Sequence, residues 1–275
     1  MDQKVTIPSL QAMKREGKKI VGVVAWDYQI ARIVDRAGVD LVSVGDTVGI
    51  NLWGQPHPLE ITMEQILVVA QAVRRGVKRA ILSCDFPYGP LQQGVDCAVE
   101  AAIRLVKEAG VDIVKLDGAS DFPEAVTAIN RAGIPVFAQF GITPQTALKY
   151  GLEYSATPSA ASQVPVEMTH ELIKEAQMLE MAGASLLNFT NSGPIVGAAV
   201  AKAVNIPVMG GFGGGPWLDG RIRMVTSAIG YAAGGLDKEP ADAYVNVAKL
   251  TYEAISAYSE DVRAAKQIKG GIPYP

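Results

Sequence analysis

Carboxylates that follow short apolar runs are the residues of this chain best suited to chemistry. Asp46 ends the run DLVSVGD, Asp85 ends AILSCD, and Asp117 follows DIVKL. If each run is a buried parallel strand, three acids delivered to one barrel mouth would form an oxygen-rich site for a hard divalent cation such as Mg2+. The alternative is that each acid only caps the helix that follows it. The pattern therefore predicts a metal or substrate site, with helix capping as the competing explanation.

Strand-like and helix-like segments alternate along the chain, which predicts an α/β fold, a (βα)8 TIM barrel. Near-continuous apolar runs are typical of strands covered on both faces. The competing fold is a doubly wound open sheet, and the lack of a GxGxxG motif after the first strand argues against it. The predicted strands are Lys19–Ala25, Asp40–Gly45, Ala80–Cys84, Asp112–Leu116, Ile134–Gln139, Ser185–Phe189, Ile206–Gly210 and, more weakly, Ile222–Thr226.

Helices are predicted between these strands, including Val95–Ala109 and His170–Ala182, with a long one over Pro240–Lys266 after the barrel. The dipeptide Ala-Gly recurs at predicted helix ends, where glycine supplies a left-handed C-cap. We expect one domain over residues 1–275, with the C-terminal helix packed on the barrel or on a neighbouring subunit. Gly151–Val166, the longest irregular stretch, is a candidate lid.

Composition argues against several classes of protein. Of the 275 residues, 49% are hydrophobic and 19% are charged, and the net charge is −3. A sizeable core is therefore available, and no basic face predicts nucleic acid or an anionic membrane as a partner. Two cysteines, Cys84 and Cys97, argue against a disulfide scaffold and are expected to be small core residues. Without a visible signal or membrane span, we expect a cytoplasmic protein.

Three segments resemble signatures of the ketopantoate hydroxymethyltransferase (3-methyl-2-oxobutanoate hydroxymethyltransferase) family. Ala25–Tyr28 (AWDY) is similar to TAYDY, Val44–Gly49 (VGDTVG) to VGDSLG, and Gly141–Gln145 (GITPQ) to GLTPQ. The order and spacing of the family's motifs hold from about residue 7 to about residue 225. The resemblance implies a barrel of the phosphoenolpyruvate mutase/isocitrate lyase superfamily, a bound Mg2+, and a 2-oxo acid that chelates it.

The resemblance also implies roles for residues at matching positions. Asp46 and Asp85 match metal-ligating carboxylates, and Asp117 stands where the family has a glutamate near the metal. Lys115 matches a group that contacts an oxygen of the substrate, and an ion pair with Asp85 or Asp117 is an equal alternative. Thr47 stands for a serine that holds the substrate carboxylate. The implied substrate-binding residues are Tyr28, Asp46, Thr47, Asp85 and Lys115.

Two departures from the family concern proton transfer. Gln139 replaces the histidine of the family's HLGLTPQ motif, and Asn188 replaces the glutamate assigned as the base. An amide forms hydrogen bonds but does not accept a proton near neutral pH. The predicted catalytic residues are therefore Lys115, Gln139 and Asn188, with His57 as a substitute base. His57 lies between two prolines; its alternative is an exposed loop histidine, and Tyr88 or a metal-bound hydroxide are other candidate bases.

Two further features admit two interpretations each. Trp26, Trp53 and Trp217 are expected near the mouth, where they would wall the substrate or simply pack in the core. The glycine run Gly210–Gly215 is a candidate phosphate site, because barrels often bind phosphate after the seventh strand, whereas the resemblance implies close backbone packing.

Together these features predict a Mg2+-dependent aldolase-type enzyme that acts on a 2-oxo acid through a metal-stabilised enolate. Hydroxymethyl transfer, with methylene-tetrahydrofolate or an aldehyde as co-substrate, is the leading reaction. The alternatives are a carbon–carbon lyase or hydrolase of the same superfamily, and an oxo-acid-binding paralogue with altered catalysis. We expect a homo-oligomer.

Overall fold

A computed structural model describes residues 3–153, 163–211 and 214–271. The chain divides into two compact units, Met1–Ile222 and Arg223–Pro275, which are described separately. Most of the predicted lid, Gly151–Val166, and two residues of the glycine run lie outside the described residues. The prediction of a single domain over residues 1–275 stays a prediction.

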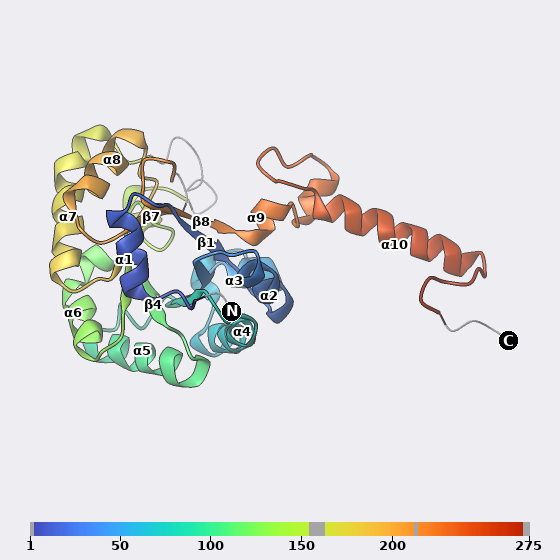
Figure 1. The fold of residues 1–275 in the computed structure, drawn as a ribbon, viewed down its shortest axis with the longest axis horizontal. Helices are drawn as coiled ribbons and strands as arrows, with labels where there is room; N and C mark the ends of the chain where they lie inside the picture. Colours follow the sequence, from blue (N-terminus) through green and yellow to red (C-terminus); the bar gives the residue numbers. More distant parts are fainter. Residues whose placement is uncertain (1–2, 154–162, 212–213, 272–275) are drawn as a thin grey trace. The chain divides into compact units, whose positions relative to one another are not determined.

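Eight parallel strands form a closed barrel in chain order, which confirms the predicted TIM barrel and excludes the open doubly wound sheet (Figure 1). A hydrogen bond from the Ile20 amide to the Asp219 carbonyl, at 3.0 Å, joins the last strand region to the first. The strands are β1 (Ile20–Val24), β2 (Leu41–Val44), β3 (Ile81–Asp85), β4 (Ile113–Leu116), β5 (Val136–Gly141), β6 (Leu186–Thr190), β7 (Val208–Gly210) and β8 (Gly220–Met224).

Helices surround the strands, and neighbouring helices pack in the order α2, α4, α5, α6, α7 and α8 (Figure 1). The helices of this unit are α1 (Ile7–Arg15), α2 (Tyr28–Arg36), α3 (Val48–Trp53), α4 (Met63–Gly76), α5 (Val95–Ala109), α6 (Pro123–Arg131), α7 (Thr169–Met181) and α8 (Pro194–Ala203). Short 3-10 helices are η1 (Pro58–Glu60), η2 (Ala119–Asp121), η3 (Ala147–Tyr150) and η6 (Val166–Met168). The glycines predicted to end helices have positive φ, as expected for left-handed caps: Gly38, Gly110, Gly133 and Gly183.

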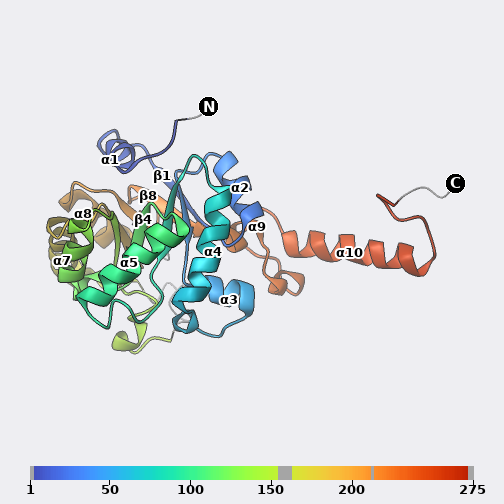
Figure 2. The same cartoon turned by 90° about the horizontal axis from the view of Figure 1, so that it is seen from below.

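The amino-terminal end of the barrel is filled with apolar side chains. Each strand contributes one residue to this cluster: Ile20, Leu41, Ile81, Ile113, Phe137, Leu186, Met209 and Ile222. Leu10 of α1, fully buried, and Val5 join the same cluster, so α1 closes this end. Figure 2 shows α1 at one end of the barrel and α3, which follows β2, toward the other. Chemistry is thereby confined to the carboxyl ends of the strands.

Several element boundaries differ from the predictions, and three of these differences have a clear structural reason. β5 begins at Val136 because Pro135 has no N–H to give to the ladder. β8 begins at Gly220, two residues early, because it alternates exposed Arg221 with buried Ile222, a pattern that a search for continuous apolar runs misses. The C-terminal helix begins at Val247 rather than Pro240, because the Asn246 side chain accepts the Lys249 N–H and caps it there.

The second unit contains α9 (Val225–Ile229), η7 (Ala233–Leu236) and α10 (Val247–Arg263). Within this unit α10 packs with η7, and Ala248 is its one buried residue. Apolar side chains of α10 are exposed, among them Leu250, Ile255 and Val262. In the part of the chain that the structure describes, no helix combines the length and the apolar character needed to cross a bilayer.

Leu10→Ala should lower the free energy of unfolding by about 2–5 kcal/mol, because it leaves a cavity where α1 closes the barrel. Ile33→Ala, on the exposed side of α2, is the control and should change stability by no more than about 0.5 kcal/mol. Denaturant unfolding monitored by circular dichroism measures both. Equal midpoints for the two variants would contradict a packing role for α1.

Candidate functional site

The three predicted acids lie at the carboxyl ends of three neighbouring strands. Asp46 follows β2, Asp85 is the last residue of β3, and Asp117 follows β4, and all three are buried. Helix capping does not explain them, because the N-cap residues of the helices that follow are Thr47 for α3, Gly94 for α5 and Phe122 for α6, none with a side-chain cap bond. The capping alternative is therefore wrong for these acids, and their burial at one end of the barrel has another cause.

An ion pair joins β3 to β4 inside the mouth. The Lys115 ammonium donates to Asp85 Oδ2 at 2.8 Å, and both side chains are at least nine-tenths buried. The Ser43 hydroxyl and the Asp46 backbone N–H also approach the Asp85 carboxylate, each at 3.5 Å. The structure thus confirms the ion-pair interpretation of Lys115, and its predicted contact with a substrate oxygen is compatible with this arrangement.

Gln145 connects the other two acids. Its side-chain amide donates to Asp46 Oδ2 at 3.0 Å, and its backbone N–H donates to Asp117 Oδ2 at 3.3 Å. Gln145 was not among the predicted site residues, although it ends the GITPQ segment that resembles the family signature. The motif therefore marks Gln145 as a candidate site residue. It gives no indication of the contact with Asp46, which lies 99 residues away along the chain.

Burial without enough counter-charge raises the pKa values of two of these acids. Burial, and after it the charge of Asp85, raises the pKa of Asp46 to about 7. Burial likewise raises the pKa of Asp117 to about 6. Burial alone would lower the pKa of Lys115, but the charges of Asp85 and Asp46 outweigh it, so that pKa is raised and the amine stays charged. One ammonium thus faces three carboxyl groups, and a cation would relieve their repulsion.

The donors present fit a magnesium ion held by few protein ligands. In the described ranges, no three side chains of His, Cys, Asp or Glu gather closely enough to bind one ion. Mg2+, however, commonly takes one or two carboxylates and completes its shell with water and substrate oxygens. The neighbouring carboxylates of Asp46 and Asp85 suit that role, and buried Asp117 Oδ1 has no partner. Direct ligation by Asp117 stays a prediction.

A second polar cluster, formed by Gln139, Thr190 and Asn188, lies on β5 and β6. Gln139 Nε2 donates to Thr190 Oγ1 at 2.9 Å, and that hydroxyl donates to Asn188 Oδ1 at 3.4 Å. Gln139 and Asn188 are register partners, and all three side chains are at least 95% buried. Thr190 was not predicted, because an isolated threonine at a strand end carries no distinctive signal. None of these three groups accepts a proton near neutral pH.

The remaining predicted site residues lie in different surroundings. Thr47 is buried at the start of α3, near Gly45. Tyr28 begins α2, is 38% exposed, and lies under the Arg32 guanidinium at 5.4 Å. The half-buried His57 accepts the Leu59 N–H at Nδ1, at 3.3 Å, and so caps η1. Substrate contact by Tyr28 and base catalysis by His57 stay predictions.

Trp217 and the described part of the glycine run pack closely against neighbouring residues. Trp26 is buried, whereas Trp53 is 46% exposed. Trp217 donates to Ser192 Oγ at 3.1 Å and lies where a side chain on Gly197 would clash. Close backbone approach between Gly210 and Gly214 supports packing in the glycine run. The two cysteines differ: Cys84 is buried, with burial raising the pKa of its thiol, and Cys97 is half-buried on α5.

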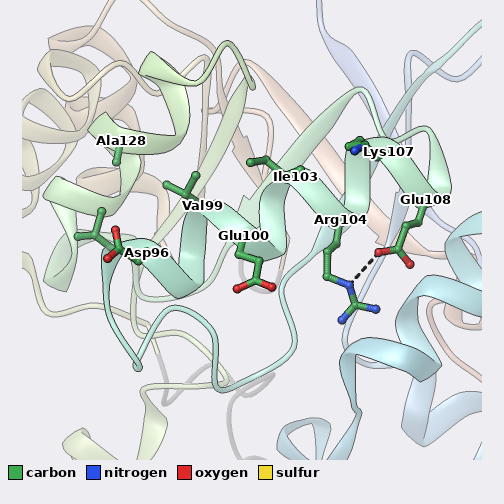
Figure 3. Close-up of a pocket in the computed structure, with 9 residues that line it drawn as sticks. Asp96, Val99, Glu100, Ile103, Arg104, Lys107, Glu108 and Ala128 are labelled. Atoms are coloured by element: carbon green, nitrogen blue, oxygen red, sulfur yellow. Dashed lines mark hydrogen bonds and ion pairs between the residues drawn. The ribbon is translucent and has the colours of Figure 1, made fainter.

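A separate groove of about 570 Å³ runs along the outer face of α5 and reaches Ala128 of α6 (Figure 3). Its charged side chains pair locally: Arg104 binds Glu108 at 2.8 Å and Glu64 at 3.2 Å. Apolar Val99 and Ile103 line it beside these charges. The groove is built from helix surfaces rather than strand ends, so we assign the chemistry to the barrel mouth.

Comparison with known proteins identifies the family. The sequence profile of the ketopantoate hydroxymethyltransferase family matches residues 4–267. The chain belongs to this family. It is 35% identical to the 3-methyl-2-oxobutanoate hydroxymethyltransferase of Cyanothece sp. over 264 residues, covering 94% of this chain and 96% of that protein. It is 34% identical to the enzyme of the same name from Flavobacterium johnsoniae, covering 96% and 94%. Membership of a family of transferases makes the chain an enzyme.

Solved structures confirm the fold. A phosphonopyruvate hydrolase in complex with oxalate and Mg2+ superposes with a TM-score of 0.59 at 14% identity, covering 98% of this chain and 92% of that one. 2,3-Dimethylmalate lyase, a member of the phosphoenolpyruvate mutase/isocitrate lyase superfamily, gives a TM-score of 0.56 at 15% identity, covering 100% and 91%. The sequence comparisons thus confirm the predicted family, and the solved structures confirm the barrel fold.

The raised pKa of Asp46 predicts a pH-dependent stability in the metal-free protein. Folding raises this pKa from its ordinary 3.8 to about 7, so the folded state keeps a proton that the unfolded chain releases. Stability should therefore fall as pH rises from about 4 to about 7. Asp46→Asn should make this slope shallower and leave the part that comes from the raised pKa of Asp117. Urea midpoints measured in EDTA across this range test it, with exposed Asp96→Asn as the control. Parallel curves for wild type and Asp46→Asn would refute the assignment.

Proposed function

We propose that this enzyme uses Mg2+ to form an enolate from a 2-oxo acid and makes a carbon–carbon bond with it, as a hydroxymethyltransferase. The observation that carries the proposal is the buried cluster of Asp46, Asp85 and Lys115 at the mouth of a barrel of this family. The hydrolase with the same fold, crystallised with oxalate and Mg2+, offers a parallel for a cation and an oxo-acid-like ligand in such a barrel.

In this proposal Asp46 and Asp85 hold the cation, with Asp117 beside it. When bound, Mg2+ would polarise the ketone of a chelating 2-oxo acid and stabilise negative charge on its oxygen. Lys115, fixed by Asp85, faces the same mouth with a charged amine and would attract the substrate carboxylate. Thr47, buried at the start of α3, would orient that carboxylate. Burial of the cluster excludes water and strengthens each of these interactions.

One observation favours a second candidate, a retro-aldol lyase. The Gln139–Thr190–Asn188 cluster has no proton acceptor, so abstraction of a proton from carbon would need a base outside the cluster, such as His57 or Tyr88. To serve as a base, His57 would have to release the Leu59 N–H from Nδ1. Cleavage that starts at a substrate hydroxyl needs no base aimed at carbon.

The co-substrate of synthesis would be methylene-tetrahydrofolate or an aldehyde. The cytoplasmic location of the protein stays a prediction.

The metal assignment predicts that Asp46→Asn and Asp85→Asn each abolish Mg2+ binding, because each removes a charge from the acid cluster. Asparagine keeps the shape of the side chain, which limits damage to the fold. Isothermal calorimetry with MgCl2 measures the affinity, and Asp96→Asn, on the surface of α5, should leave it unchanged. Wild-type affinity in both site variants would remove these carboxylates from the metal site.

Proton exchange tests the enolate directly. Wild type incubated with Mg2+ and a panel of 2-oxo acids in D2O should lose the proton signal beside the ketone. His57→Ala should slow this exchange by ~10²–10⁴-fold if His57 is the base. Asn188→Glu should then partly restore exchange to that variant, because it places a carboxylate on β6.

Two outcomes would redirect the proposal. No exchange by wild type, together with cleavage of 4-hydroxy-2-oxo acids, would establish the lyase instead. Exchange that survives both His57→Ala and Tyr88→Phe would exclude these two side chains as the base.

We also propose that the protein is a homo-oligomer, since Leu250, Ile255 and Val262 expose apolar surface on α10. Light scattering should give a mass that is a multiple of 29.1 kDa. Leu250→Asp with Ile255→Asp should lower that mass if α10 forms the interface, whereas Lys249→Ala, a polar change on the same helix, should not. A mass of 29.1 kDa at all concentrations would overturn the oligomer.

A further inference from the structure

One part of the barrel wall is not covered on its outer side. In the strands from β2 to β7 every residue is buried except the half-buried Gly141, as expected for parallel strands that helices cover on their outer face. β1 and β8 differ, because Val21 of β1 is 49% exposed and Arg221 of β8 is also exposed. These two strands are neighbours in the closed barrel, so their exposed side chains belong to one stretch of its wall.

The outward direction of these side chains follows from their alternation along a strand. Ile20 and Ile222 belong to the apolar cluster inside the barrel, so Val21, Val23 and Arg221 point outward. We call these three outward residues the β1–β8 window. Between β7 and β8 the described residues contain no helix, so the ring of helices is not continued there beyond α8. The window is therefore a place where a barrel of this kind normally carries a helix.

The helix α10 has an apolar face that the described part of the chain leaves exposed. With 3.6 residues per turn, its large apolar residues gather on one side, whereas Lys249, Glu253 and Glu260 lie on the other. The apolar face consists of Leu250, Ala254, Ile255, Tyr258 and Val262, all of them exposed. Helices in proteins are stable mainly because such a face is packed against another surface. The sequence of α10 therefore calls for a partner surface.

We propose that the apolar face of α10 covers the β1–β8 window of a second copy of this chain, and that the second copy returns the same contact. The inference rests on the homo-oligomer proposed above, not on the reaction, and it identifies the surface that receives α10. Each copy carries one helix face and one window, and in a single chain both are exposed. A twofold exchange covers both surfaces of both copies with one kind of contact made twice, which is a low-cost route to a dimer.

The two surfaces match in length and in chemistry. The 17 residues of α10 extend for about 25 Å, so the helix spans a strand of five residues, which extends for about 17 Å. The valines of the window are apolar, like the face that would cover them. Glu253 and Glu260, two turns apart on α10, supply negative charge for Arg221. The Arg221 guanidinium gives one N–H to the Gly214 carbonyl at 2.7 Å, and its other donors suit a carboxylate.

A change confined to the window tests the inference. Val21→Lys places an ammonium group under the apolar face of the partner's helix, and should raise the dissociation constant of the oligomer at least about tenfold. Because Val21 is exposed in the single chain, the variant should fold, and circular dichroism checks this. Val68→Lys, at an exposed valine of α4, is the matched control and should leave the dissociation constant unchanged. Light scattering over a series of concentrations measures both.

Mixing two variants shows which surfaces meet. Val21→Lys keeps an intact α10, and Leu250→Asp with Ile255→Asp keeps an intact window, so a mixed dimer retains one of its two contacts. At concentrations where neither variant associates alone, the mixture should form pairs of twice 29.1 kDa, detected through an affinity tag on one variant. Pairing of α10 with α10 would give no such recovery, because every mixed contact would include one altered helix.

The outcomes distinguish this exchange from the proposed oligomer. A wild-type mass of 29.1 kDa at all concentrations overturns both. An oligomer that Val21→Lys leaves as stable as wild type, or a mixture that does not associate, overturns the exchange and leaves the homo-oligomer standing. None of these measurements depends on Mg2+ or on a substrate, so the proposed reaction is tested separately.

Discussion

The ion pair between Asp85 and Lys115 is the interaction on which the rest of the mouth depends. A buried carboxylate is tolerated only with a partner, and Asp85 has the single ammonium of the cluster at 2.8 Å. Asp46, close to the same carboxylate, is left with amide contacts and a raised pKa. Because Lys115 neutralises one acid, the others are left short of positive charge, and in the proposed function this imbalance would favour a bound cation. Parallel strands of fixed register make the pairing possible, since Asp85 and Lys115 are partners across β3 and β4.

The mouth has two chemically different halves. β2, β3 and β4 supply charged groups, whereas β5 and β6 supply two amides and a hydroxyl. In a barrel each strand end is attached to its own βα unit, so one half can change without rebuilding the other. Here the charged half keeps carboxylates and a lysine at the positions that the family resemblance implies, and the changes at Gln139 and Asn188 lie in the neutral half. In the proposed function, the charged half would hold the cation and the oxo acid, and the neutral half would offer only hydrogen bonds.

The fold and the acid cluster could be predicted from the sequence because short stretches of it carry the signal for both. Each of the three acids ends or follows an apolar run, and parallel strands necessarily bring such positions together. The contacts of Gln145 with Asp46 and of Gln139 with Thr190 could not be predicted, since 99 and 51 residues separate the partners and only the closed barrel sets their distance. Similarly, the start of the amphipathic β8 and the cap at Asn246 were missed, because exposure and capping depend on packing that hydropathy does not record.

The helix α1 has a consequence for the order of events in a reaction. With Leu10 and Val5 packed among one residue from every strand, the barrel is sealed at its amino-terminal end. A ligand therefore reaches the strand ends from the carboxyl-terminal side of the barrel. Where two reactants enter by the same route, the one that binds deeper must bind first and dissociate last. In the proposed function, the oxo acid would bind at the buried charges and would be the deeper of the two. Methylene-tetrahydrofolate or an aldehyde would then bind after it, and tetrahydrofolate, where it is formed, would leave before the product.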